Sequence, residues 1–152
     1  MILKIKKLKS DATLPSYGHP GDAGMDLYAA ENVTIRARER VKIPTGIAME
    51  IPEGYAGLIW DKSGLSMSYG LKTLGGVIDA GFRGEIIIGV ANMSDTEYTI
   101  EKGHKIAQIL IQRVESPTLE EVADLTGSPR GGKGFGSTGK WSPLSSPFKW
   151  TR

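Results

Sequence analysis

The sequence predicts an all-β domain, a sandwich or barrel of the jelly-roll type, and three observations support this fold class. Apolar residues recur with a period of two rather than the helical period of about 3.6. The chain of 152 residues contains 20 glycines and 8 prolines, and no long segment has the pattern of an amphipathic helix. Many short strands separated by turns pack well as two sheets or a barrel. Periodicity alone leaves the strand topology open.

Strands are expected where apolar residues alternate with polar ones or where β-branched residues gather. Residues 1–9 alternate apolar side chains with lysines, and residues 45–51 alternate in the same way. Residues 55–60 form an apolar run after Pro-Glu-Gly, and residues 85–91 are rich in β-branched side chains. Each segment has the length of an ordinary strand.

A hairpin and two short helices complete the expected elements. Residues 98–100 and 105–114 are expected to be strands joined by residues 101–104, where Gly103 is suited to a positive φ. The helical candidates are residues 64–69 and residues 119–123, each of about one or two turns.

The apolar pattern thins after residue 115 and is absent from residue 127 onward, where glycine, serine, proline and charge predominate. The sequence therefore predicts a β-barrel core over residues 1–126 and a flexible C-terminal arm over residues 127–152. A mass of 16.4 kDa fits a single domain.

Composition excludes several classes of function. The net charge of +2, from 19 basic and 17 acidic residues, provides no global field suited to nucleic acid. Without cysteines the chain has no disulfide, thiolate metal site or cysteine nucleophile, and His19 and His104 are its only imidazoles. A Ser-His-Asp hydrolase or a His-rich zinc site is therefore poorly supported. The N-terminus is predicted to be a strand rather than a signal peptide, which favours a soluble cytoplasmic protein that binds no membrane.

The segment RGGKGFGSTG, which begins at Arg130, has the composition of a flap that closes over a nucleotide. Its glycines free the backbone to approach a ligand closely. Arg130 and Lys133 supply charge for phosphate, Ser137 and Thr138 supply hydroxyl donors, and Phe135 offers a ring face for a base. The alternative for such a segment in isolation is a flexible glycine-rich terminus.

Two inner segments contain groups suited to phosphate chemistry. In residues 61–66, a turn after the apolar run could point Lys62, the Ser63 hydroxyl and backbone amides at one anion. In residues 75–85, glycines bracket a short β segment that carries Asp79, and a carboxylate beside bound polyphosphate can orient a water and accept its proton. Taken alone, the first segment is better explained as a solvated turn, and the second is also consistent with a glycine-rich hairpin that contains an Asx turn.

Taken together, five segments resemble the five ordered motifs of the trimeric dUTP diphosphatases (dUTPases). They are residues 22–29 (DAGMDLYA), 62–65 (KSGL), 76–85 (GVIDAGFRGE), 103–109 (GHKIAQI) and 130–139 (RGGKGFGSTG). Five motifs in the same order are not expected by chance. The resemblance implies a jelly-roll homotrimer whose active sites lie between subunits, with the C-terminal arm of one chain closing over a site built mainly by two others.

The resemblance also implies roles in dUTP hydrolysis. Asp79 would activate the water that attacks the α-phosphorus, which releases pyrophosphate and leaves dUMP. Phe82 would stack under the deoxyribose and leave no space for a 2′-hydroxyl. The residues implied to read the uracil edge are Thr73, Gly76, Val77, Ile78 and Ile87, and a narrow pocket there excludes thymine and cytosine.

The remaining implied residues contact the triphosphate and its metal. Asp26 would hydrogen-bond to waters on Mg²⁺, which keeps several waters and takes phosphate oxygens. Arg83 and Glu85 would serve the hairpin and the subunit interface rather than the reaction. The implied phosphate and arm contacts are Lys62, Ser63, Gly64, Gln108, Arg130 (γ-phosphate), Phe135 (covering the uracil), Gly136, Ser137 and Thr138.

Three positions depart from the family pattern. Lys62 stands where the family usually has Arg, Phe82 where it usually has Tyr, and Thr73 where several members have an Asn that touches the base. The implied activity is Mg²⁺-dependent hydrolysis of dUTP, which limits uracil in DNA and supplies dUMP for thymidylate. The alternatives are a dCTP deaminase of the same fold, which would need Glu in place of Arg83, and a non-catalytic dUTP-sensing module, against which the presence of Asp79 argues.

Overall fold

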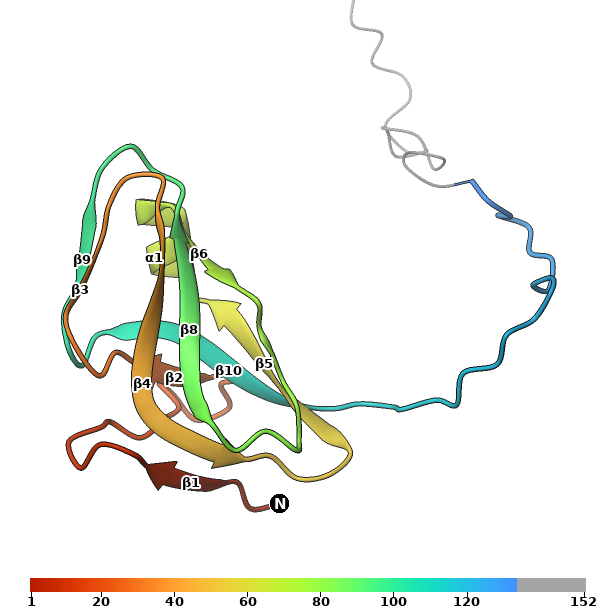
Figure 1. The fold of residues 1–152 in the computed structure, drawn as a ribbon, viewed down its shortest axis with the longest axis horizontal. Coiled ribbons are helices and arrows are strands. Elements are labelled where there is room, and N and C mark those ends of the chain that lie inside the picture. The colour runs from red at the N-terminus through yellow and green to blue at the C-terminus, as the bar shows by residue number, and fades with distance from the viewer. Residues whose placement is uncertain (134–152) are drawn as a thin grey trace, which may run out of the picture. The chain divides into compact units, whose positions relative to one another are not determined.

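The computed structural model describes residues 1–133, and these residues form a β-rich fold with one short helix (Figure 1). The all-β prediction is confirmed. The strands are β1 (Lys4–Lys7), β2 (Met25–Tyr28), β3 (Val33–Ile35), β4 (Arg40–Glu50), β5 (Tyr55–Asp61), β6 (Leu71–Leu74), β7 (Val77–Ile78), β8 (Glu85–Asn92), β9 (Tyr98–Ile100) and β10 (Lys105–Arg113), and the helix is α1 (Ser63–Tyr69).

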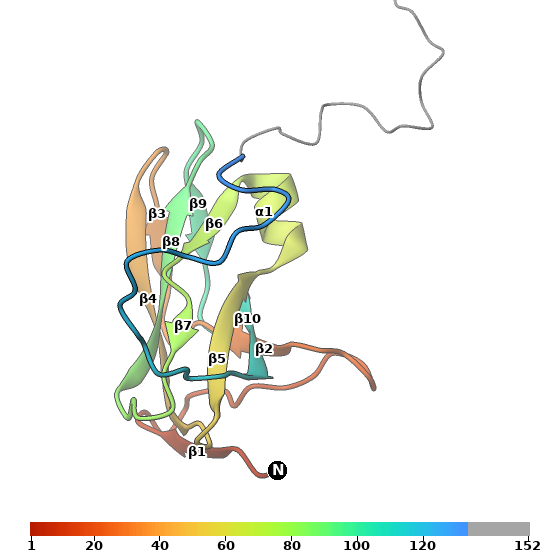
Figure 2. The same cartoon turned by 90° about the vertical axis from the view of Figure 1, so that its right-hand side faces the viewer.

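The strands form two four-stranded sheets and a two-stranded ribbon. One sheet has the order β1-β4-β8-β6, the other has the order β2-β10-β5-β7, and β3 pairs with β9. These strand pairs are antiparallel. The chain crosses repeatedly from one sheet to the other, as β5, β6 and β7 show, and α1 continues from the upper end of β5 (Figure 2). This is a jelly-roll-like arrangement.

Both sheets contribute side chains to one hydrophobic core. In β8 the pattern of alternation is regular, so that Ile86, Ile88 and Val90 are buried while Ile87 points outward. Each fully buried aliphatic side chain contributes about 1.5–3 kcal/mol relative to leaving it exposed. The largest fully buried apolar side chains are Leu27, Ile35, Ile43, Ile47, Met49, Ile51, Ile86, Ile88, Ile100 and Ile109.

A bulge in β4 depends on a glycine. The register with β8 shifts between Pro44 and Ala48, and Gly46 within this shift has a φ of 69°. The Gly46 amide donates to Glu85 Oε1 at 2.7 Å. A Cβ atom at Gly46 would lie 2.9 Å from the Ala12 Cβ. Glu85 thus secures the bulge at the start of β8.

Two of the expected elements are wrong in detail. The segments 98–100 and 105–114 do not form a hairpin with each other, because β9 pairs with β3 whereas β10 pairs with β2 and β5. The turn between them is present, with Gly103 at a φ of 83° and the His104 amide donating to the Glu101 carbonyl, but it carries the chain into another sheet. Periodicity identifies strands without identifying their partners.

The expected helix over residues 119–123 does not form. Residues 117–133 contain no helix or strand, and Leu119 is almost fully exposed. A helix this short needs an apolar face packed on a core, and this segment buries none. One compact unit comprises Met1–Ser116, and the boundary expected near residue 126 stays a prediction. Within residues 1–133, no helix has the length and apolar character needed to span a membrane.

We predict that Gly46→Ala lowers the free energy of unfolding by about 2 kcal/mol or more, because the left-handed φ and the close Ala12 contact both oppose a Cβ atom. Urea denaturation would measure the change. Gly54→Ala is the matched control, since Gly54 has a φ of 78° but no atom near the added Cβ, so it should lose only about 1 kcal/mol. Equal losses of unfolding free energy in the two variants would contradict a cost from the contact with Ala12.

Candidate active site

The site forms where β5 ends and α1 begins. Lys62 is the residue before the helix, with extended backbone (φ −78°, ψ 120°), and Gly70 ends the helix in the left-handed conformation. The Lys62 side chain makes no capping bond and instead reaches the Asp26 carboxylate, with Nζ 2.6 Å from Oδ1. Ser63 and Gly64, the next two predicted phosphate contacts, are exposed in the first turn.

Asp26 is a buried carboxylate with two lysines. It is 4% exposed in β2, and Lys105 Nζ lies 2.7 Å from its Oδ2 while Lys62 occupies Oδ1. Burial acts to raise the pKa of the Asp26 carboxyl, but the hydrogen bonds and charges of Lys105 and Lys62 outweigh it, and the pKa lies below its ordinary value. The same hydrogen bond and charge raise the pKa of Lys105. Asp26 is therefore ionised at neutral pH.

This arrangement bears on the predicted metal role of Asp26. Residues 1–133 contain no group of three or more acidic or histidine side chains that could hold a metal ion. The two oxygens of Asp26 already accept from ammonium groups. The described residues therefore offer no protein cage for a metal ion, and the role of Asp26 toward Mg²⁺ stays a prediction.

Asp61 joins the two sheets at the site. Its Oδ1 accepts from both the amide and the hydroxyl of Thr73 in β6, each at 2.7 Å, and its Oδ2 lies 2.5 Å from Lys72 Nζ. Its backbone carbonyl accepts from Gln108 Nε2 at 2.9 Å. The sequence analysis assigned no role to Asp61, because an Asp in this position is typical of an ordinary turn. The signal that could have revealed it is a carboxylate at the end of an apolar strand.

A cavity of about 300 Å³ lies beside Asp61. Glycine makes it possible, because Gly75 and Gly76 have φ values of 73° and 127° and the Gly76 carbonyl accepts from the Ile59 amide at 2.7 Å. A Cβ atom at Gly76 would lie 3.1 Å from the Ile59 carbonyl oxygen. The cavity is lined by Leu58, Ile59, Trp60, Lys72, Thr73, Gly75, Gly76 and Val77.

The structure brings some predicted base-reading residues together and separates others. Thr73, Gly76 and Val77 line the cavity. Ile78 pairs with Gly57 and packs against the core, and Ile87 is 46% exposed on the outer face of β8, so neither is among the cavity-lining residues. The role of these two positions as contacts to a base stays a prediction.

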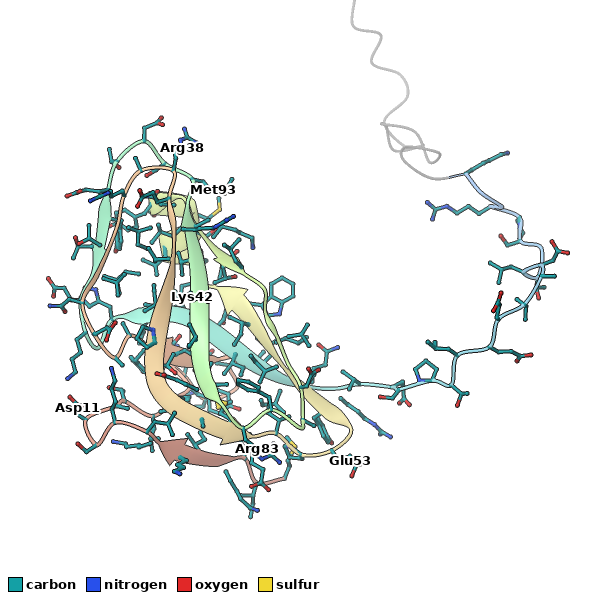
Figure 3. The ribbon with its side chains drawn as sticks, viewed as in Figure 1. Asp11, Arg38, Lys42, Glu53, Arg83 and Met93 are labelled. Atoms are coloured by element: carbon teal, nitrogen blue, oxygen red, sulfur yellow. The ribbon has the colours of Figure 1, made fainter. Side chains whose placement is uncertain are left out.

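Asp79 lies in a turn directly after β7. The turn is closed by the Phe82 amide, which donates to the Asp79 carbonyl at 3.0 Å, and by Arg83, whose Nη1 donates to the carbonyls of Ala80 and Phe82. Arg83 lies just before β8, near the lower end of the fold in Figure 3. Asp79 itself is exposed, and within residues 1–133 its carboxylate has neither a hydrogen bond nor an ion pair.

The positions of the other predicted residues follow from the fold. The Phe82 ring covers Gly84, where a Cβ atom would lie 2.7 Å from Phe82 Cζ. The Gln108 side chain lies between the end of β5 and Gly24. Arg130 is exposed, and its Nε donates to the Lys133 carbonyl. The predicted arm contacts Phe135, Gly136, Ser137 and Thr138 lie outside the described residues.

The fold and the site define an all-β, jelly-roll-like protein with a lysine-bearing polar site and an accessible carboxylate. The sequence profile of the dUTPase family matches residues 10–139. The chain therefore belongs to the dUTPase family, as the five motifs indicated.

Individual relatives support this assignment. The chain is 47% identical over 140 residues to the deoxyuridine 5'-triphosphate nucleotidohydrolase of Clostridium tetani, a match that covers 91% of this chain and 97% of the relative. The dUTPase of Staphylococcus bacteriophage 80alpha, solved with dUpNHpp, has a TM-score of 0.86 at 35% identity, covering 91% and 98% of the two chains. A mutant dUTPase of S. aureus phage phi11, described with a coordinated structural Mg(II) ion, has a TM-score of 0.77 at 31% identity over 82% of this chain and 98% of that chain.

We predict that Asp61→Asn lowers the free energy of unfolding at pH 7 by about 1–3 kcal/mol, because it removes the charge that Lys72 and Thr73 face. Burial acts to raise the pKa of Asp61, but the bonds from Lys72 and Thr73 outweigh it, and the pKa lies below 3.8. The stabilisation is therefore present above pH 3.8 and is lost as the pH falls through the depressed value. Urea titrations at several pH values should show the two proteins converging in acid, whereas a constant difference would contradict this origin.

Proposed function

We propose that the chain hydrolyses dUTP to dUMP and pyrophosphate in a Mg²⁺-dependent reaction. Its membership of the dUTPase family supports this, as do relatives named deoxyuridine 5'-triphosphate nucleotidohydrolase. The observation in the structure that carries the proposal is the exposed Asp79 carboxylate, which no cation neutralises within residues 1–133.

The proposed chemistry needs a base that stays ionised and accessible. Asp79 would accept a proton from a water as the water oxygen bonds to the α-phosphorus and the bond from that phosphorus to the bridging oxygen breaks. Pyrophosphate leaves with the bridging oxygen. The carboxylates of Asp26 and Asp61 are less suited to this role, because lysines already occupy them.

Base and sugar selection follow from the shape of the same region. The cavity beside Asp61 is lined partly by glycine backbone, which presents amide and carbonyl groups at short range to a uracil edge. The exposed Phe82 ring, held over Gly84, would stack against the deoxyribose and exclude a 2′-hydroxyl. Base selection would thus rest on backbone hydrogen bonds in a narrow space, and sugar selection on packing against Phe82.

The phosphates would be held by Lys62, Gln108, Ser63 and Gly64 near the end of β5, with Arg130 and the arm residues completing the site. Bound Mg²⁺ would neutralise negative charge on the phosphate oxygens, and Asp26 would hydrogen-bond to its waters. We further propose that the protein is a cytoplasmic homotrimer with active sites shared between subunits, as the family resemblance implies.

We predict that Asp79→Asn lowers kcat for dUTP by about 10²–10⁴-fold, because the amide cannot accept the proton of the attacking water. Steady-state kinetics would measure kcat, and calorimetry with dUpNHpp should show binding within about threefold of wild type. Asp95→Asn is the matched control, since Asp95 pairs with Arg38, a residue far from Arg83 in Figure 3. Unchanged turnover in Asp79→Asn would sink the assigned mechanism.

Product analysis tests the function itself. The purified protein with Mg²⁺ is offered dUTP, dCTP, dTTP and UTP separately, and pyrophosphate and base identity are followed. We expect pyrophosphate from dUTP alone, because the proposed pocket excludes the thymine methyl, the cytosine amino group and the 2′-hydroxyl. Ammonia from dCTP would assign the chain to the deaminases, and binding of dUTP without product would favour a sensor.

A further inference from the structure

Two lysines share the buried Asp26 carboxylate, and one of them has no role in the site as described so far. Lys62 pairs with Oδ1 and is a proposed phosphate contact, whereas Lys105 pairs with Oδ2. We propose that Lys105 is a positioning residue, which keeps Asp26 neutralised when Lys62 moves from Asp26 to a substrate phosphate. This inference rests on the proposed function, because it concerns how the same site takes up the triphosphate.

The cluster of Asp26, Lys62 and Lys105 carries unbalanced charge. Asp26 carries one negative charge and the two lysines carry two positive charges, so the cluster has one positive charge in excess. An incoming polyphosphate attracts whichever ammonium group can reach it. The side chains of Lys62 and Lys105 are 31% and 49% exposed, so exposure does not distinguish them. Lys62 is the first residue of the predicted phosphate-binding segment KSGL, and this position assigns it to the phosphate.

Moving Lys62 to a phosphate would take one of two cations away from Asp26. Breaking a buried ion pair by removing one partner is strongly unfavourable, because the remaining charge is no longer compensated. Asp26 is 4% exposed, so water cannot replace Lys62 fully. Lys105 removes this penalty, since its own bond to Oδ2 does not depend on Lys62.

The pairing of β10 with β2 places Lys105 beside Asp26. Lys105 is the first residue of β10, which pairs with β2, and the register of this pair shifts between Lys105 and Ala107. The turn over residues 101–104 precedes it and is closed by its own hydrogen bond. Asp26 and Lys105 therefore lie on paired strands, whereas Lys62 lies on the connection between β5 and α1.

The test is binding of dUpNHpp to Lys105→Met, measured by calorimetry with and without Mg²⁺. We expect binding about tenfold weaker than wild type, because Lys62 would now leave Asp26 uncompensated. Lys105→Arg should bind within about twofold of wild type, since it keeps the charge. Lys102→Met is the matched control, because Lys102 lies in the adjacent turn and pairs with the exposed Asp11. With dUTP as substrate, the change in KM should exceed the change in kcat.

A double-mutant cycle separates positioning from direct contact. In an Asp26→Asn background no buried charge needs compensation, so Lys105→Met should weaken dUpNHpp binding by less than about twofold. Undiminished binding by Lys105→Met alone would overturn the inference, and so would an equal loss in both backgrounds, which would mean that Lys105 touches the ligand. If Lys105→Met does not fold, Lys105→Gln carries the same expectations. Failure of wild type to bind dUpNHpp would instead contradict the proposed function.

Discussion

The Asp61 carboxylate is the contact on which the site depends, because it joins strands of different sheets where the chain changes direction. Its hydrogen bonds to Thr73 hold β6 against the end of β5, and its carbonyl receives the Gln108 side chain from β10. Residues next to Asp61 or bonded to it line the cavity, and Lys62 and the start of α1 come directly after it in the chain. A sandwich that crosses between sheets needs such polar links, since the backbone groups at its crossings lack ladder partners.

The three carboxylates around the site differ in environment, and this difference separates their roles. Asp26 is buried between two lysines, Asp61 is partly buried between Lys72 and Thr73, and Asp79 is exposed without a cation partner in residues 1–133. A carboxylate paired with a cation stabilises the fold and balances local charge. A carboxylate without such a partner can accept a proton from a water. The proposed division of labour is therefore a consequence of packing: three chemically identical groups are placed in three surroundings.

Sequence reasoning found the fold class and most of the strands because period-two alternation reports which side chains are buried. It found the five motifs by their resemblance, in the same order, to those of the dUTPase family. It did not find the partners of β9 and β10, since a turn such as residues 101–104 looks the same whether it joins paired strands or different sheets. It also missed Asp61 and Lys105, whose roles arise from contacts with residues distant in the chain, Thr73 and Asp26.

The lysines of this site suit an exchange of partners. An arginine at position 62, the usual residue in the family motif, could present parallel donors to two anions at once, because its guanidinium is a rigid fork. The ammonium of Lys62 is a single compact charge on a flexible stem and already lies 2.6 Å from Asp26 Oδ1. To bind phosphate closely it must give up part of that contact. A chain that carries Lys at this position therefore depends more on a second cation at Asp26, and Lys105 occupies that place.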